Sequence, residues 1–301
     1  SDVCSSDLLK DNCFKVDIHL MPDLPDATPE KDMEMFDQIF SPIQDQPDQI
    51  KIYPCEVTPY TVIQKWYNQG TYKPYGDNPE IIADVVAYAM EKCPPWIRLP
   101  RVVRDIPLSY ISGGNKMPNL RQIVDNKLNA RGKVCKDLRS REIGRNAVYS
   151  QKDAQLFVRK YYNTGGNNSI DYFISFESKD NKALFGFIRL RIVNDNNHNY
   201  LFPELNSKGL IRELHVYNTL VPVGQKFGNS TQHVGFGKKL VKKAEEISMS
   251  HSKKGTVVIS GEGVKEYYYK LGYKPSEYFL TKEFGIKDYT YFYIQNYKQL
   301  N

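Results

Sequence analysis

The residues with the clearest chemistry lie in the short segment 232–237 (QHVGFG). Two glycines allow a backbone to approach a ligand closely, and the first N–H groups of a helix have no intrahelical partner. A lysine and a periodic run of apolar residues follow directly, so we expect a helix to begin here. The amides of its first turn would then bind a diphosphate. The residues that we expect to contribute are Gln232, Gly235, Phe236, Gly237 and Lys238.

The elements on either side are those that such a site needs. Residues 211–217 (IRELHVY) have the β-branched and aromatic content of a strand, on which Glu213, His215 and Tyr217 share one face. Downstream, the apolar residues of the helix recur at the spacing of one stripe, and we interpret its lysines mainly as a solvated face. That stripe consists of Leu240, Val241, Ala244 and Ile247.

Two adjacent tyrosines follow the next predicted strand, 256–260. Val264, Tyr267, Tyr268 and Leu271 stand at helical spacing, and Gly272 ends the helix. This spacing predicts core packing as readily as it predicts chemistry. Both tyrosines therefore stay open between a packing role and a proton-transfer role.

The spacing Gln-x-x-Gly-x-Gly, with a strand before it and a helix after it, resembles the acetyl-CoA signature of the GNAT acyltransferases. The resemblance implies that acetyl-CoA lies with its pantetheine arm along Glu213, Leu214, His215 and Val216. In that superfamily a tyrosine four residues before the closing Gly-aromatic pair protonates the departing thiolate. The resemblance therefore implies Tyr268 as the acid, with Tyr267 and Glu213 as further catalytic candidates.

A closer resemblance is to the family of Elongator catalytic subunits, which modify the wobble uridine of tRNA. The segments RELHVY, QHVGFG, VISGEGV and YYYKLGY resemble the acetyltransferase domain of that family. The segments HLMPDLP, KIYP, PPW, RVVRDIP and RSREIG resemble its radical-SAM domain and the segment that joins the two domains. The resemblance runs from Phe14 to Lys282. It implies tRNA as substrate, other Elongator subunits as partners, SAM and a [4Fe–4S] cluster as cofactors, and carboxymethylation of the uridine at carbon 5.

The cysteines depart from this family pattern. They are scattered without a Cys-x-x-Cys pair, which predicts unpaired thiols in a reducing compartment, and they include no closely spaced triplet of the kind that holds a radical-SAM cluster. We therefore expect no metal site in this chain, and a chain that begins inside the radical-SAM domain. Residues 1–9 match nothing in the family, and we expect them to be a non-native start outside the fold. The five cysteines are Cys4, Cys13, Cys55, Cys93 and Cys135.

Alternating strand-like and helix-like runs predict an α/β chain. Strands are expected at 15–20 and 50–53, and helices after Thr28-Pro29, at 61–69 and at 80–92. With the resemblance, this gives the C-terminal part of a radical-SAM partial barrel (10–96), a basic connecting segment (97–136) and a mixed α+β GNAT domain (137–301). The chain has no run of about 18 apolar residues, so we expect a cytoplasmic protein without a membrane span.

Positive charge is concentrated between Arg98 and Arg145. This segment carries twelve Lys or Arg against four Asp or Glu, whereas the whole chain has a net charge of +6. Charge runs are often only solvated surface, but a cluster between two enzyme-like domains favours a track for an RNA backbone. The candidate phosphate contacts are Arg101, Arg104, Arg139 and Arg141. Arg139 and Arg141 could instead pair with acidic groups at the domain junction.

The remaining motifs carry less information. The aromatic and β-branched residues 289–294 predict a final strand or hairpin. His198 lies in a polar loop and is interpreted as solvated, whereas His251 is expected at a helix end, where its charge suits the helix dipole.

Two other functions fit the same residues. One is a GNAT N-acetyltransferase for lysine or a small amine, with Glu213 or His215 as general base and Tyr268 as acid. The other is a non-catalytic tRNA-binding scaffold that only senses acetyl-CoA.

Overall fold

The computed structural model describes residues 3–41, 46–145, 148–162, 169–194, 200–217 and 235–300. The chain divides into two compact units. We call residues 16–140 the three-stranded unit, and residues 1–15 with 141–301 the seven-stranded unit, after their main sheets.

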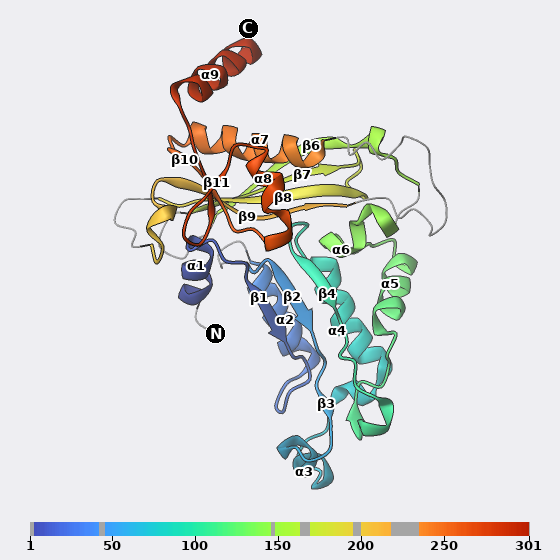
Figure 1. Ribbon diagram of the computed structural model, residues 1–301. Coiled ribbons are helices and arrows are strands. Elements are labelled where there is room, and N and C mark those ends of the chain that lie inside the picture. Colours follow the sequence, from blue (N-terminus) through green and yellow to red (C-terminus); the bar gives the residue numbers. More distant parts are fainter. Residues whose placement is uncertain are drawn as a thin grey trace. The chain divides into compact units, whose positions relative to one another are not determined.

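A parallel sheet of order β1-β2-β4 forms the centre of the three-stranded unit (Figure 1). Its strands are β1 (Asp17–Leu20), β2 (Gln49–Ile52) and β4 (Arg98–Arg101). The helices α2 (Pro29–Phe40) and α4 (Pro79–Lys92) bury apolar side chains in one core with Ile50, Ile52 and Leu99, and α5 (Leu120–Ala130) packs on α4. Thr28 caps α2 as expected, because its hydroxyl accepts the N–H of Lys31.

The three-stranded unit also contains a second, smaller sheet and several short helices. The antiparallel pair β3 (Glu56–Val57) and β5 (Gly113–Gly114) lies next to α3 (Val62–Asn68). Two 3-10 turns, Tyr75–Asp77 and Leu108–Tyr110, and the short helix α6 (Leu138–Arg141) complete the chain up to the second unit.

The seven-stranded unit is built on a mixed sheet of order β11-β12-β10-β9-β8-β7-β6. All neighbours are antiparallel except β9 and β10, which are parallel. The strands are β6 (Gln155–Tyr162), β7 (Ile170–Glu177), β8 (Leu184–Ile192), β9 (Lys208–Val216), β10 (Gly255–Val258), β11 (Lys274–Pro275) and β12 (Leu280–Glu283).

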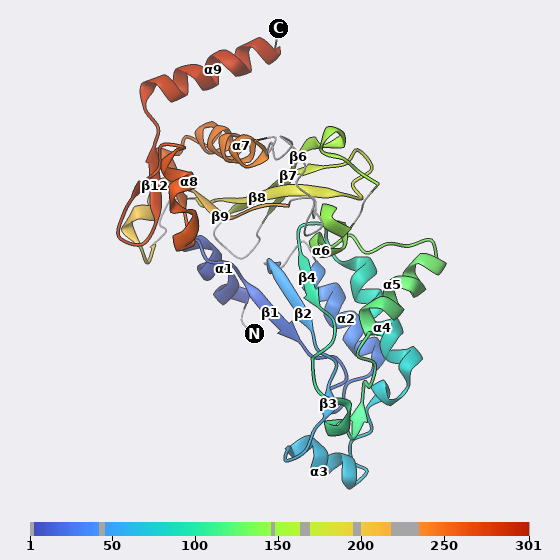
Figure 2. The same cartoon turned by 45° about the vertical axis from the view of Figure 1, so that its right-hand side comes forward.

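Helix α7 (Phe236–Ser250) packs across β7, β8, β9 and β10, and its predicted apolar stripe is buried (Figure 2). The other helices of this unit are α1 (Val3–Asp11), α8 (Lys265–Tyr269) and α9 (Ile286–Leu300), with 3-10 turns at Ile143–Arg145, Gln151–Asp153, Pro203–Leu205 and Glu262–Val264.

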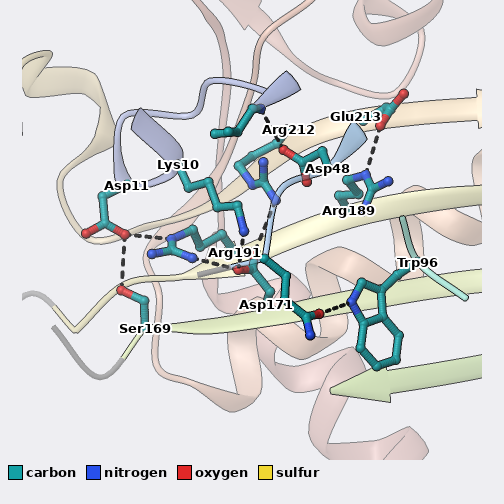
Figure 3. A network of polar contacts seen from close by, with 12 residues as sticks. Lys10, Asp11, Asp48, Trp96, Ser169, Asp171, Arg189, Arg191, Arg212 and Glu213 are labelled. Atoms are coloured by element: carbon teal, nitrogen blue, oxygen red, sulfur yellow. Dashed lines mark hydrogen bonds and ion pairs between the residues drawn. The ribbon is translucent and has the colours of Figure 1, made fainter. Parts of the chain in front are cut away.

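Residues 3–11 do not stand outside the fold, which differs from the expectation for the first nine residues. The guanidinium of Arg191 on β8 contacts the carboxylates of Asp11 on α1 and of Asp171 on β7 (Figure 3). It also contacts the carboxylate of Asp7 on α1. Arg212 on β9 reaches the other oxygen of Asp171 at 3.2 Å. These side chains are all buried, so their charges must be compensated within the network.

Two further expectations are corrected. The basic segment 97–136 is not a connector, because it supplies β4 and α5 to the three-stranded unit. Residues 289–294 lie in helix α9, so the predicted strand or hairpin is wrong. The carboxylate of Asp288 accepts the N–H of Gly285 and stabilises the first turn of that helix, a local signal that outweighs the β-branched composition.

His251 lies at a helix end, as expected from the sequence. His251 does cap the C-terminus of α7, but burial, Lys160 and Lys253 lower its pKa, so its neutral form is favoured there. His198 lies outside the described residues.

No helix in the described part of the chain is long and apolar enough to span a bilayer.

Candidate functional site

The site begins where β9 and β10 separate. β10 pairs with β9 only along residues 208–211, whereas β8 pairs with β9 up to Val216. Residues 212–216 of β9 therefore continue beyond the part of the strand that pairs with β10 in the described structure. Backbone N–H and C=O groups at such an opening need partners, and a ligand with amide groups can supply them.

The start of α7 lies at the same opening. Gly235 is the N-cap residue with φ of 68°, a left-handed conformation that glycine adopts without strain. The amides of Phe236, Gly237 and Lys238 belong to the first turn and have no intrahelical acceptor. Phe236 is buried and its ring packs on Phe176 at 4.6 Å between centroids, which fixes this turn against the sheet. A helix that starts with such amides is the feature from which the sequence predicts an anion site, and that assignment stays a prediction.

A pocket of about 580 Å³ joins these features. Leu214 and Val216 of β9 line one side, residues 235–238 line another, and Tyr267 and Tyr268 close it from α8. Eight of the predicted ligand or catalytic residues thus meet at one cavity. Gln232, the remaining residue of the predicted loop, lies outside the described residues.

Tyr267 has a hydroxyl with no use in the described fold. This oxygen is buried and has no hydrogen-bond partner among the described residues. It lies directly over the start of α7, because a Cβ built on Gly237 would come within 2.5 Å of it. A side chain at position 237 would therefore force the tyrosine hydroxyl to shift, and this hydroxyl has no hydrogen-bond partner among the described residues.

Tyr268 packs in the core and also lies at the pocket. Its ring is buried in the core and contacts the rings of Tyr267 and Tyr273 edge-on, yet the residue also lines the pocket. Burial, with a smaller effect of Tyr267, raises its pKa above the usual range of a phenol. The hydroxyl is protonated at neutral pH, as an ordinary phenol is, and burial makes it a weaker acid than a free tyrosine.

Glu213 and His215 do not line the pocket, so a contact of the pantetheine arm with these two residues stays a prediction about their backbone. Side chains alternate along a strand, so residues next to Leu214 and Val216 point to the opposite face of the sheet. Glu213 pairs with Arg189 at 2.8 Å (Figure 3). It also pairs with Lys15 at 2.7 Å. Although burial alone would raise the pKa of Glu213, Arg189 and Lys15 lower it overall. A carboxylate in this state is a weak base.

The four predicted phosphate contacts separate into two pairs. Arg101 and Arg104 are exposed, and Arg101 is only engaged with exposed Asp105. Arg141 is buried and pairs at 2.8 Å with buried Glu177, which is the alternative that the sequence left open. Arg139 is half-buried, and its backbone N–H donates to Asp137. Arg141 is thus unavailable to a phosphate.

Several basic residues of segment 98–145 form ion pairs with acidic residues that lie outside this segment. On α4, Glu80 and Asp84 pair with Lys127, Asp84 also pairs with Arg131, and Glu91 pairs with Lys133. The exposed candidates that remain are Arg101, Arg104 and Lys116.

The chain is similar to known proteins both in sequence and in structure. Residues 47–130 match the Radical_SAM C-terminal domain family. The chain is 36% identical over 287 residues to Elongator complex protein 3 of Schizosaccharomyces pombe and 35% identical over 285 residues to the human protein; each alignment covers 93% of this chain and 51% of the relative. It is also 36% identical over 286 residues to the tRNA uridine(34) acetyltransferase of Methanocaldococcus infernus, covering 93% and 52%.

A solved structure, archaeal M. infernus Elp3 with an N-terminal deletion, superposes with a TM-score of 0.83 at 34% identity, covering 94% of this chain and 66% of that one. The fold and the site define a chain that joins the C-terminal part of a radical-SAM domain to a GNAT domain, and the predicted fold class is confirmed. The chain belongs to the family of Elongator complex protein 3. It spans about half the length of the curated relatives it matches.

The contact between Gly237 and Tyr267 gives a first prediction. In a Tyr267→Phe background, Gly237→Ala should stabilise the protein by about 0.5–1 kcal/mol, because alanine is the better helix residue. In the native background the same change should be destabilising by about 1 kcal/mol, since the new methyl group meets the hydroxyl. Urea unfolding of the four variants measures this difference, and equal effects in both backgrounds would contradict the contact.

The buried pair of Arg141 and Glu177 gives a second prediction. Arg141→Ala should lower the free energy of unfolding by about 3 kcal/mol, because it removes one of the cations that compensate the buried Glu177 and leaves that carboxylate with Arg159. Arg101→Ala, at an exposed pair, is the matched control and should change stability by less than about 0.5 kcal/mol. Equal stability losses would show that Arg141 is not structurally buried.

Proposed function

We propose that this chain carries the acetyl-CoA site of a tRNA wobble-uridine acetyltransferase. The observation that supports this most is the pocket that combines the opening between β9 and β10 with the start of α7. The relatives named above supply the substrate class, tRNA uridine at position 34. Action in the cytoplasm, together with other Elongator subunits, belongs to the same proposal.

Acetyl-CoA would lie across the opening in an extended conformation. The amides of Phe236, Gly237 and Lys238 would bind its diphosphate, with the exposed Lys238 side chain nearby. Residues 212–216 of β9 would pair with the amide groups of the pantetheine arm. When bound, acetyl-CoA supplies an acetyl group activated as a thioester.

The two tyrosines would act at the thioester end. Tyr268, which lines the pocket with its hydroxyl protonated, would donate a proton to the departing thiolate. Tyr267 would use its otherwise unpartnered hydroxyl to orient the ligand. The ion-paired state of Glu213 argues against an amine acetyltransferase with this residue as the base.

Carboxymethylation at carbon 5, implied by the family resemblance, is the overall modification that we propose. The described residues do not fit a [4Fe–4S] cluster, because they contain no group of three His, Cys, Asp or Glu able to hold a metal. Burial also raises the pKa of Cys13 to about 12, and those of Cys55 and Cys135 are raised, which disfavours thiolate ligands. We assign no radical step to residues of this chain.

The acetyl-CoA assignment predicts a specific effect of Gly235→Asn. Asparagine tolerates the left-handed conformation, and a Cβ at this position meets nothing within 4 Å, so the protein should fold with a stability loss of about 1 kcal/mol or less. The new side chain would occupy the diphosphate space, and calorimetry should show acetyl-CoA binding at least ten times weaker.

Gly132→Asn is the matched control. Gly132 follows α5 with φ of 67° and open space around its Cβ, so the substitution has the same backbone cost at a residue of the other unit that does not line the pocket. It should leave acetyl-CoA affinity unchanged. Equal affinity of the Gly235→Asn variant and the native chain would remove the pocket assignment, and binding without any tRNA-dependent consumption would favour the sensing scaffold.

The tRNA assignment predicts an effect on the salt dependence of binding. Arg101→Ala and Arg104→Ala should each reduce the slope of log affinity against log salt concentration by about 0.7–0.9, the contribution of one phosphate contact. Gel-shift titrations of a tRNA at several salt concentrations measure the slope. Arg131→Ala, which removes a cation paired with Asp84, is the control, and an unchanged slope in the double variant would exclude Arg101 and Arg104 as contacts.

A further inference from the structure

The segment that carries α3 has an unusual composition. Residues 57–76 contain five aromatic side chains and two lysines, but no acidic residue. Figure 2 shows α3 at one end of the three-stranded unit, next to β3. The aromatic residues are Tyr60, Trp66, Tyr67, Tyr72 and Tyr75.

Three of these aromatic residues hold the segment in place. The buried Tyr72 donates its hydroxyl to the carbonyl of Asp23, and Tyr75 donates to the carboxylate of Asp32 at 2.6 Å. The ring of Tyr67 packs so closely on Gly113 that a Cβ there would come within 2.6 Å of it. Tyr60 and Trp66 have no such use, since their exposed fractions are 102% and 41%.

Tyr60 is also held in a backbone conformation that a non-glycine residue rarely adopts. Its φ is 65°, and a bulky side chain at positive φ is strained. The N–H of Tyr60 donates to Oε1 of Gln64, whose own N–H donates to the hydroxyl of Thr61. The helix cap thus fixes the backbone that presents a fully exposed ring. Glycine would fit this backbone better, so packing does not account for the tyrosine.

The charged residues of this segment are both basic, which suits a polyanion. Lys65 precedes Trp66 and Lys73 follows in the same segment, and both are exposed. Arg104, an exposed phosphate candidate, acts electrostatically on Glu56 of β3, the strand that leads into this segment. Aromatic rings beside cations are the usual means of holding unpaired bases, because every base has a face that can stack.

We propose that Tyr60 and Trp66 form a stacking site for unpaired bases of an RNA. This inference rests on the RNA substrate of the proposed function. It adds a contact that does not depend on phosphate charge, located on α3 and the turn before it.

Tyr60→Gly tests the proposal because its two expected effects have opposite signs. Relief of the strained backbone should leave the melting temperature unchanged or raise it. Loss of the ring should weaken binding of a single-stranded uridine oligonucleotide about tenfold, with no change in the salt slope. Tyr60→Phe keeps a stacking ring and should bind like the native chain. A fully paired duplex should bind the native and glycine variants equally.

Trp66 provides an independent optical signal. Single-stranded RNA should quench tryptophan fluorescence of the full chain, and Trp66→Phe should remove most of that quenching, since the other tryptophan, Trp96, is partly buried and hydrogen-bonded to Gln46. Ser252→Gly, at another exposed residue with positive φ, is the control for backbone relief and should not alter RNA affinity.

The outcomes separate this inference from the function on which it rests. If the native chain binds RNA and Tyr60→Gly binds it equally well, the stacking site is wrong and the function stands. If the native chain binds neither the oligonucleotide nor tRNA, the RNA part of the proposed function fails, and the stacking site with it. If Tyr60→Gly changes only concentration-dependent sedimentation, the rings contact protein and the proposal is overturned.

Discussion

The separation of β9 from β10 is the constraint on which the rest of the site depends. Two parallel strands that pair over only four residues leave backbone amides facing an opening, and buried amides cannot remain without partners. The unpaired first turn of α7 opens at the same pocket. The polar atoms available to a ligand are therefore mainly backbone atoms held by secondary structure. Side chains such as Leu214 and Phe236 can then be apolar and still belong to the binding site.

Charged side chains in this chain mostly maintain structure. Arg191 meets three carboxylates in a buried network, Arg141 meets Glu177, and Glu213 is shared by two cations. Breaking one such pair leaves a charge in a medium of low dielectric, so these partners are tightly coupled. Charges at the surface are screened by water and ions and remain free to meet a partner. Burial, not residue type, therefore decides which arginines can take part in recognition.

Local sequence patterns predicted the elements that are fixed by local physics. The Thr28 cap, the glycine start of α7 and the apolar stripe of α7 depend on residues within a few positions of one another. The errors arose where the deciding partner is far along the chain, as in the pair of Arg141 with Glu177. For Glu213 the strand was predicted correctly, but its pairing with Lys15 and Arg189 was not, because neither the register nor distant partners can be read from the strand alone.

Gly235 and Tyr60 share a left-handed backbone, at φ of 68° and 65°, but use it in opposite ways. At Gly235 the missing side chain leaves open space over a helix start, which a ligand can fill. At Tyr60 the same conformation is combined with a large ring that contacts nothing in the core and points into solvent. Strain at an exposed position lowers stability without improving packing. Such a residue is best explained by what it presents to a partner, as the absence of a side chain at Gly235 is best explained by what it admits.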